Sequence, residues 1–254
     1  MTIALILSGG TGTRLGAGIP KQYIKVNDRT ILSYSLSTLL DHSEIDAVQI
    51  VADPVWQELI LDELQRIQSL EKKGCLAETK LQSVPRENLM GAAVGQKFRG
   101  FSAPGTTRQL SILNGLQDIR RYAADTDIVM IHDAARPCLT AKLVTECLAA
   151  IKGHDGVLPV LPMKDTVYLS EDGARVSSLL NRSQVFAGQA PEFFVLGKYY
   201  EANQRLLPDK ILEINGSTEP AILAGLDVVM VPGDEGNFKV TTKADLERFV
   251  QMVL

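Results

Sequence analysis

Cysteine and histidine are scarce in this sequence of 254 residues, which contains three of each. Cys75, Cys138 and Cys147 are odd in number, widely spaced and without a C-x-x-C pair, which argues against a disulfide framework and a cysteine zinc site. The histidines form no H-E-x-x-H pattern, which argues against a zinc site of that kind. The sequence therefore predicts neither structural disulfides nor zinc.

Long apolar runs and an excess of basic charge are also missing. No apolar stretch approaches the roughly 18 residues that span a bilayer, and the apolar N-terminal run has no basic region and is too short for a signal peptide. The formal net charge is -4, whereas a general nucleic-acid binder is more often basic. We expect a cytoplasmic protein that binds neither nucleic acid nor membrane, although a local basic pocket for a small polyanion is compatible with an acidic total.

Strand and helix patterns alternate along most of the chain. Continuous apolar runs predict strands at 3–7, 47–52, 127–132, 156–160 and 227–231, and helical periodicity predicts helices at 30–40, 55–70, 111–122, 141–151, 195–206 and 243–253. These spacings are typical of parallel βαβ units. We predict one α/β domain over 1–254, with a mostly parallel sheet flanked by helices.

Two segments depart from this alternation. Residues from about 70 to 103 scatter lysines and arginines among glycines and small residues, which predicts a surface insertion without chemistry. Residues 165–180 read as a β-hairpin with its turn at Asp172-Gly173. We expect an arm at about 164–183, because a hairpin that leaves an α/β body often packs on a partner subunit.

A glycine-rich string, SGGTGTRLG, follows the first predicted strand, and Pro20-Lys21-Gln22-Tyr23 comes shortly after it. Glycines allow backbone N–H groups to approach phosphates closely. Arg14 and Lys21 could clamp a triphosphate and neutralise the charge that develops during its reaction. The third glycine, Gly16, is one position late for a dinucleotide fingerprint, and no P-loop string exists. We therefore predict a nucleoside triphosphate loop rather than a plain glycine-rich turn.

An acidic residue stands at the end of the strand predicted at 127–132. Ligands of open α/β sheets bind beyond the carboxyl ends of strands, so Asp133 could hold the Mg²⁺ of a nucleotide and Arg136 could reach the phosphate of a second substrate. The alternative is an N-cap with a surface ion pair. His132 is interpreted as a packed or orienting histidine rather than a ligand.

Other groups have both a functional and a structural interpretation. The string from Gly105 to Ser111 opens a helix and could read a base edge, or it is only a capped helix start. Arg182, after the arm, is either a solvated charge or a group that reaches a neighbouring site. Lys239 stands between apolar residues and either points into a site or occupies an edge strand.

Taken in this order, these strings resemble the 2-C-methyl-D-erythritol 4-phosphate cytidylyltransferases, and the ribitol-5-phosphate cytidylyltransferases share most of the pattern. The resemblance rests on G-x-G-x-R-L-G…P-K-Q, R-x-x-S-I-x-N-G-L, H-D-A-A-R-P, the D-T hairpin and F-K-V-T. It implies a Rossmann-like domain whose β-arm builds a homodimer. It also implies a Mg²⁺-dependent reaction that joins CTP to a polyol phosphate and releases pyrophosphate.

The resemblance also assigns roles. It implies that Arg14 and Lys21 stabilise the transition state, that Asp133 lies on the metal side, and that Arg182 and Lys239 position the acceptor phosphate. The implied nucleotide-binding residues are Leu7, Ser8, Gly9, Gly10, Gly12, Gly105, Thr106, Arg108 and Ser111. The implied acceptor-binding residues are Arg136, Thr166, Arg182, Thr218 and Lys239, with Thr166 acting from across the dimer.

Three strings depart from the family pattern. Ser8-Gly9-Gly10 stands where A-A-G is common, Q-A-P-E at 189–192 where Q-T-P-Q is common, and S-T-E-P-A at 217–221 where T-D-E-A-S is common. The last two lie where the family binds the polyol, so they leave the acceptor open. We predict methylerythritol phosphate, with ribitol phosphate or another alditol phosphate as the alternative. A catalytically silent subunit and a sugar-1-phosphate nucleotidyltransferase are further alternatives.

Overall fold

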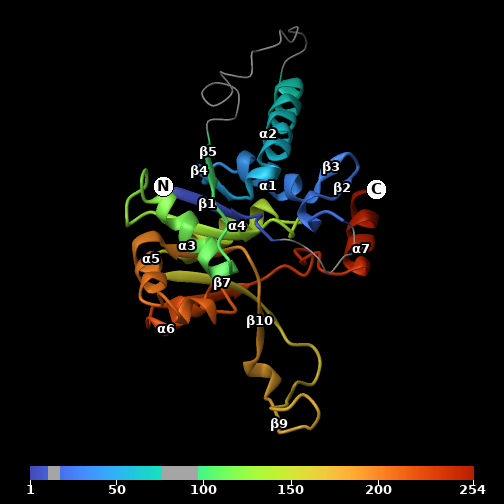
Figure 1. The fold of residues 1–254 in the computed structure, drawn as a ribbon. Helices are drawn as coiled ribbons and strands as arrows, with labels where there is room; N and C mark the ends of the chain where they lie inside the picture. Colours follow the sequence, from blue (N-terminus) through green and yellow to red (C-terminus); the bar gives the residue numbers. More distant parts are fainter. Residues whose placement is uncertain (11–17, 76–96) are drawn as a thin grey trace.

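The computed structural model describes residues 1–10, 18–75 and 97–254 and contains an α/β fold built on one large sheet (Figure 1). The strand order is β10-β7-β11-β6-β1-β4-β5, and β12 pairs with β7. The strands of this sheet are β1 (Thr2–Leu7), β4 (Ala47–Val51), β5 (Phe98–Ser102), β6 (Ile128–Asp133), β7 (Gly156–Pro162), β10 (Phe186–Gly188), β11 (Glu192–Val195) and β12 (Val228–Pro232). Only β10 and β11 run antiparallel to their neighbours, so the sheet is mixed but mostly parallel, as predicted.

Helices cover both faces of the sheet. They are α1 (Ile31–Asp41), α2 (Pro54–Cys75), α3 (Arg108–Ile119), α4 (Ala141–Ala150), α5 (Leu196–Gln204), α6 (Glu219–Leu223) and α7 (Lys243–Val253). Strand β1 is apolar from Ile3 onward because both of its faces are covered. Ala4 and Ile6 pack into the core with α1, α2 and α4, whereas Ile3 and Leu5 pack against α3 and α5. Successive side chains of a strand face opposite sides, so a strand covered on both faces has no polar alternation.

The register of the sheet fixes the relation between two predicted site segments. Strand β1 lies between β4 and β6 and is parallel to both, with Leu7 opposite Val51 on one side and Asp133 on the other. The chain leaves β1 into the glycine-rich string at this point. The start of the string, Ser8 to Gly10, and Asp133 are therefore neighbours at the same edge of the sheet, although they are far apart in sequence.

Threonine caps define several helix starts. Thr30, Thr107, Thr140 and Thr242 each accept a hydrogen bond at Oγ1 from the backbone of the first turn of α1, α3, α4 and α7. Helix α3 begins at Arg108 rather than at the predicted residue 111, because Thr107 Oγ1 accepts from Leu110 N at 3.2 Å. Arg108 thus belongs to the first turn of a helix.

The predicted insertion at 70–103 was too wide at both ends. Helix α2 continues to Cys75, and residues 98–102 form β5, an edge strand paired with β4. Strand β11 was also missed, although it brings Phe193 and Phe194 into the core. Residues 76–96 lie outside the described residues.

Smaller elements complete the fold. A short hairpin pairs β2 (Lys25–Val26) with β3 (Arg29–Thr30), and the single-turn 3-10 helices are η2 (Lys21–Tyr23), η4 (Arg182–Gln184) and η5 (Lys210–Leu212). In the described ranges 1–10, 18–75 and 97–254, no helix is both long and apolar enough to cross a membrane.

The predicted hairpin extends away from the body of the molecule (Figure 1). Strands β8 (Tyr168–Leu169) and β9 (Ser178–Leu179) pair antiparallel, and Gly173 turns the chain with a φ of 71°. Asp172 Oδ1 accepts from the backbone N–H groups of the next turn at 2.9 and 2.8 Å. The arm and the strand after it expose large apolar side chains, 41–67% accessible: Tyr168, Leu169, Val176, Leu179 and Phe186.

Candidate active site

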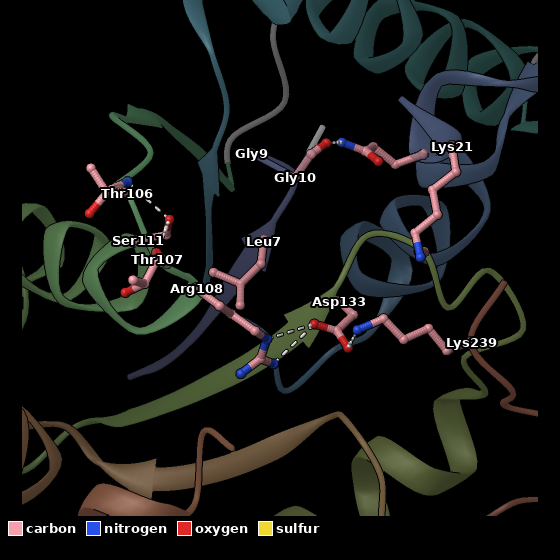
Figure 2. A pocket seen from close by; sticks show the side chains of 13 residues that line it. Leu7, Gly9, Gly10, Lys21, Thr106, Thr107, Arg108, Ser111, Asp133 and Lys239 are labelled. Atoms are coloured by element: carbon pink, nitrogen blue, oxygen red, sulfur yellow. Dashed lines mark hydrogen bonds and ion pairs between the residues drawn. The ribbon is translucent and has the colours of Figure 1, made fainter. Parts of the chain in front are cut away.

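A cavity of about 420 Å³ lies beyond the carboxyl ends of β1 and β6 (Figure 2). This is the edge at which open α/β sheets bind ligands. Its lining residues come from the glycine-rich string, η2, the start of α3, β6 and the segment before α7: Leu7, Gly9, Gly10, Lys21, Gln22, Gly105, Thr106, Thr107, Arg108, Ser111, Asp133, Ala135 and Lys239. Predicted residues from four distant parts of the chain therefore meet in one place.

Asp133 is surrounded by cations. Lys239 Nζ donates to its Oδ2 at 2.8 Å, and Arg108 donates to its Oδ1 from Nη2 at 3.0 Å and from Nε at 3.3 Å. Arg136 Nε lies 3.8 Å from Oδ2. Burial by itself would raise the pKa of Asp133, but Arg108, Lys239 and Arg136 outweigh it and hold the pKa well below its usual range. Asp133 is therefore a carboxylate at any physiological pH.

Lys21 reaches the same cavity from η2, with its amino group turned toward the space in front of Asp133 (Figure 2). Lys21, Arg108 and Lys239 thus approach one volume from three directions. A cavity lined by several cations and backbone N–H groups favours a polyphosphate.

The base of the glycine-rich string is held by the residues that follow Lys21. Gln22 Nε2 donates to the carbonyl oxygens of Ser8 at 2.8 Å and Gly10 at 2.7 Å. Ser8 is buried, and its hydroxyl donates to Tyr23 Oη at 2.8 Å instead of facing the cavity. A Cβ on Gly9 would lie 2.7 Å from Pro104 Cβ, so this position has no room for a side chain. Gly12 and Arg14, both predicted site residues, lie outside the described residues.

The start of α3 lines the opposite wall. Gly105 N donates to Ser111 Oγ at 2.9 Å, and this hydroxyl donates in turn to the Thr107 carbonyl at 2.9 Å. A Cβ on Gly105 would lie 2.4 Å from Leu110 Cβ and 2.8 Å from the backbone nitrogen of Ser111. Glycine is therefore required where the backbone folds tightly onto the first turn of α3. Thr106 and Arg108 are left to face the cavity.

His132 and Arg136 lie behind Asp133 and do not line the cavity. Burial lowers the pKa of His132 to about 4, so the ring is neutral near pH 7, and its Nε2 lies 3.2 Å from the Arg136 carbonyl. This agrees with the interpretation of His132 as a packed histidine. Arg136 Nη1 donates to the Asn237 carbonyl at 2.8 Å, which directs this arginine toward the segment that carries Lys239.

Besides Arg136, three more predicted acceptor residues do not line the cavity of this chain. Thr166 and Arg182 are exposed on the arm, where Arg182 Nη1 donates to the Lys164 carbonyl at 3.0 Å. Thr218 is buried, and its hydroxyl donates to Glu192 Oε2 at 3.1 Å. One chain thus holds the predicted nucleotide end of the site without the arm residues.

Sequence reasoning missed several residues of the site. Gln22, Thr107 and Ala135 line the cavity, and Gln22 stands in the P-K-Q string itself. Ser217 accepts a hydrogen bond from Arg108 Nη1, and Glu192 lies behind Ser217. The strings at 189–192 and 217–221 drew notice only as departures from the family pattern, because nothing in their own composition indicates a contact with Arg108.

Asp133 is the one carboxylate that lines this cavity in the described part of the chain, and the described residues contain no group of three or more His, Cys, Asp or Glu side chains placed to hold a metal. Mg²⁺ is commonly held by one or two carboxylates together with substrate phosphates. A single, fully ionised Asp133 beside a polyphosphate cavity fits that donor set. The described residues do not fit a metal site whose ligands all come from the protein.

A family model described as IspD, 2-C-methyl-D-erythritol 4-phosphate cytidylyltransferase, matches residues 2–253. The chain belongs to this family. It is therefore a cytidylyltransferase, in a family that acts in isoprenoid precursor synthesis.

Among relatives of this IspD chain, the 2-C-methyl-D-erythritol 4-phosphate cytidylyltransferase of Corynebacterium glutamicum is 32% identical over 96% of this chain and 89% of its own length. The enzyme of the same name from Roseobacter denitrificans is 31% identical over 96% of this chain and 93% of its own length. A bifunctional enzyme IspD/IspF from Maricaulis maris is 32% identical over 99% of this chain. The chain spans only 57% of that bifunctional relative.

Solved structures confirm the fold. The 4-diphosphocytidyl-2C-methyl-D-erythritol synthase of Anaerococcus prevotii superposes with a TM-score of 0.76 at 22% identity, covering 99% of this chain and 95% of that one. The 2-C-methyl-D-erythritol 4-phosphate cytidylyltransferase of Francisella tularensis superposes with a TM-score of 0.72 at 21% identity, covering 100% and 99%. The predicted α/β architecture is thus an IspD-like fold.

Proposed function

We propose that this IspD-family chain joins CTP to 2-C-methyl-D-erythritol 4-phosphate, giving CDP-methylerythritol and pyrophosphate. The observation that carries the proposal is the convergence of Lys21, Arg108 and Lys239 around Asp133 at the carboxyl edge of β1 and β6. Family membership supports the choice of nucleotide and acceptor. The relatives described above are methylerythritol enzymes, and no observation in the site favours the ribitol alternative.

The reaction is a displacement at the α-phosphorus of CTP. An oxygen of the acceptor phosphate forms the new P–O bond, and the bond to the β-phosphate breaks as pyrophosphate leaves. Such chemistry depends on positioning and charge neutralisation more than on a protein nucleophile. Lys21 and Arg14 stabilise the charge that builds on the α-phosphate, and Lys239 orients the acceptor phosphate.

Nucleotide binding rearranges the contacts of Asp133. Asp133 would hold Mg²⁺ together with the phosphates of CTP, and the bound ion supplies neutralisation of phosphate charge. Arg108 and Lys239 now donate to the same carboxylate and would exchange part of that contact for phosphate oxygens. Gly9, Gly10 and the first turn of α3 bring backbone N–H groups to the nucleotide.

The active unit is a homodimer in this proposal. Thr166 and Arg182 lie on the projecting arm and away from the cavity of their own chain, and the arm exposes Tyr168, Val176 and Leu179. Apolar side chains of this size on a projecting hairpin favour packing against another subunit. In that arrangement the arm of one chain completes the acceptor end of its partner's site. A cytoplasmic location stays a prediction of the sequence.

Pyrophosphate release tests the proposal directly. The wild-type chain is assayed with CTP and Mg²⁺ and with either 2-C-methyl-D-erythritol 4-phosphate or ribitol 5-phosphate, and then with ATP, GTP and UTP in place of CTP. We expect turnover with CTP and the methylerythritol acceptor to exceed every other combination. Faster turnover of ribitol phosphate, or equal use of the four nucleotides, contradicts the proposal.

A further inference from the structure

Arg108 lines the cavity, and its guanidinium is held by a residue that does not line the cavity. Its Nη1 donates to the hydroxyl oxygen of Ser217, which is 1% exposed and comes just before α6. On the other side of the guanidinium, Nε and Nη2 donate to Asp133 Oδ1 at 3.3 and 3.0 Å. All three guanidinium nitrogens are therefore engaged, by two anchors on opposite sides.

Ser217 is itself firmly fixed. Tyr199 Oη donates to its carbonyl at 2.6 Å, and Tyr199 is fully buried, with its ring stacked on Phe194 at a centroid distance of 4.0 Å. The Ser217 hydroxyl also hydrogen-bonds to the Glu192 carboxylate, which accepts from Thr218 Oγ1 at 3.1 Å as well. A hydroxyl can accept from arginine and donate to a carboxyl oxygen at once, so Ser217 connects Arg108 to the buried Glu192 side chain, whose pKa is raised by burial.

The two groups that hold Arg108, Asp133 and Ser217, differ in whether they face the cavity. Asp133 faces the cavity and is shared with Lys239, and under the proposed function its contact with Arg108 changes when nucleotide and metal bind. Ser217 and Glu192 are buried and do not line the cavity, so the incoming nucleotide does not compete for them there. We propose that Ser217, oriented by Glu192, is a positioning residue. It keeps the Arg108 guanidinium directed into the cavity when Asp133 contacts the metal instead of Arg108.

This inference rests on the proposed function, since it assigns Arg108 to the triphosphate of CTP. Arginine has many rotamers, and holding it in one before the ligand arrives lowers the ordering cost of binding. Loss of the Ser217 hydroxyl should therefore weaken CTP binding on the order of tenfold, the range measured for a hydrogen bond to a charged group.

The experiment measures the Kd of CTP by titration calorimetry in Mg²⁺ without acceptor. Ser217→Ala is compared with wild type and with Ser217→Thr, which returns the hydroxyl. Ser35→Ala is the matched control, because Ser35 is equally buried and, among the described residues, its hydroxyl bonds within α1, to the Leu32 carbonyl at 3.3 Å. Arg108→Met and the double variant Ser217→Ala/Arg108→Met complete a thermodynamic cycle.

We expect Ser217→Ala to raise the Kd about tenfold, Ser217→Thr to restore most of the affinity, and Ser35→Ala to leave it unchanged. We also expect Ser217→Ala to add nothing in the Arg108→Met background. A Kd within twofold of wild type for Ser217→Ala, or equal losses in both backgrounds, overturns the inference. Pyrophosphate release by the wild type is followed in parallel: its absence despite CTP binding refutes the proposed function alone, whereas the cycle reports on Ser217.

Discussion

Replacing Asp133 by asparagine should separate two roles of this carboxylate: it stabilises the fold through ion pairs, and it competes with phosphate for Arg108 and Lys239. Its side chain is only 11% exposed and accepts from Lys239 and Arg108 at 2.8 and 3.0 Å. Removing one partner of a buried ion pair costs about 3–5 kcal/mol. For a domain of this size, each kcal/mol lowers Tm by about 2–4 °C. We expect the Tm of Asp133→Asn to fall by about 10 °C at pH 7.

Nucleotide binding without metal should change in the opposite direction. The neutral amide of the Asp133→Asn variant no longer repels phosphate and no longer holds the two cations by charge. Unit charges about 4 Å apart interact by about 1 kcal/mol even in water, so we expect CTP in EDTA to bind Asp133→Asn at least about fivefold more tightly than wild type. Turnover in Mg²⁺ should nevertheless fall by about 10² or more, because the proposed metal-side carboxylate is gone.

Calorimetry in EDTA, calorimetry in Mg²⁺ and pyrophosphate release distinguish these effects. Asp125→Asn is the matched control, because Asp125 is 58% exposed and pairs with Arg120 at the surface at 2.8 Å. Such a surface pair is worth roughly 0–1 kcal/mol. Weaker metal-free CTP binding by Asp133→Asn would refute the idea that Asp133 competes with phosphate for Arg108 and Lys239.

The stability difference between wild type and Asp133→Asn should depend on pH in a defined way. The folded-state pKa of Asp133 lies below its unfolded value, so its contribution is present above the unfolded pKa and is lost as pH falls through the folded pKa. We expect a constant difference in Tm between pH 5 and 8. The difference should begin to narrow as the pH falls below the unfolded pKa of about 4, and it should continue to narrow toward the lower folded pKa.

Three other variants test the proposed roles. Lys21→Ala should lower kcat by about 10² or more while exposed Lys25→Ala leaves it unchanged; a loss confined to KM would contradict the transition-state role. Heterodimers of one Arg182→Ala chain and one Lys21→Ala chain should regain activity that neither homodimer has, and confirmed heterodimers without recovery would rule out a shared site. Gly105→Ala should lower stability by about 1–3 kcal/mol, because its Cβ meets the backbone of α3 at 2.8 Å. The control Gly216→Ala, with no atom within 4 Å, should unfold like wild type in denaturant.

Much of the fold was predictable because buried helices and strands carry apolar residues in regular patterns along the sequence. Helix α7 was predicted with its observed bounds, Lys243–Val253, since its apolar stripe follows a Thr242 cap. Strands β5 and β11 were missed for a physical reason. Phe98–Ser102 lies at the sheet edge and is only partly buried, and Glu192–Val195 has too few residues to show a period.

The candidate site was predictable where its residues stand in compact strings. Asp133 and Lys21 each occur in such a string, and the fold brings them to one cavity. The support of Arg108 was not predictable, because Ser217 is 109 residues away and contacts it only through the tertiary fold. Thr166 and Arg182 belong to a proposed site between two chains, and a single chain cannot bring them to the cavity.

The pairing of Leu7 with Asp133 joins two walls of the proposed cytidylyl-transfer site in one ladder of backbone hydrogen bonds. A shift of one residue in this ladder would turn every side chain of β1 to the opposite face. The register of β1 and β6 therefore fixes the spacing between the start of the glycine-rich string and Asp133. The strings at 189–192 and 217–221 lie outside this ladder, so substitutions there leave the spacing between Leu7 and Asp133 unchanged.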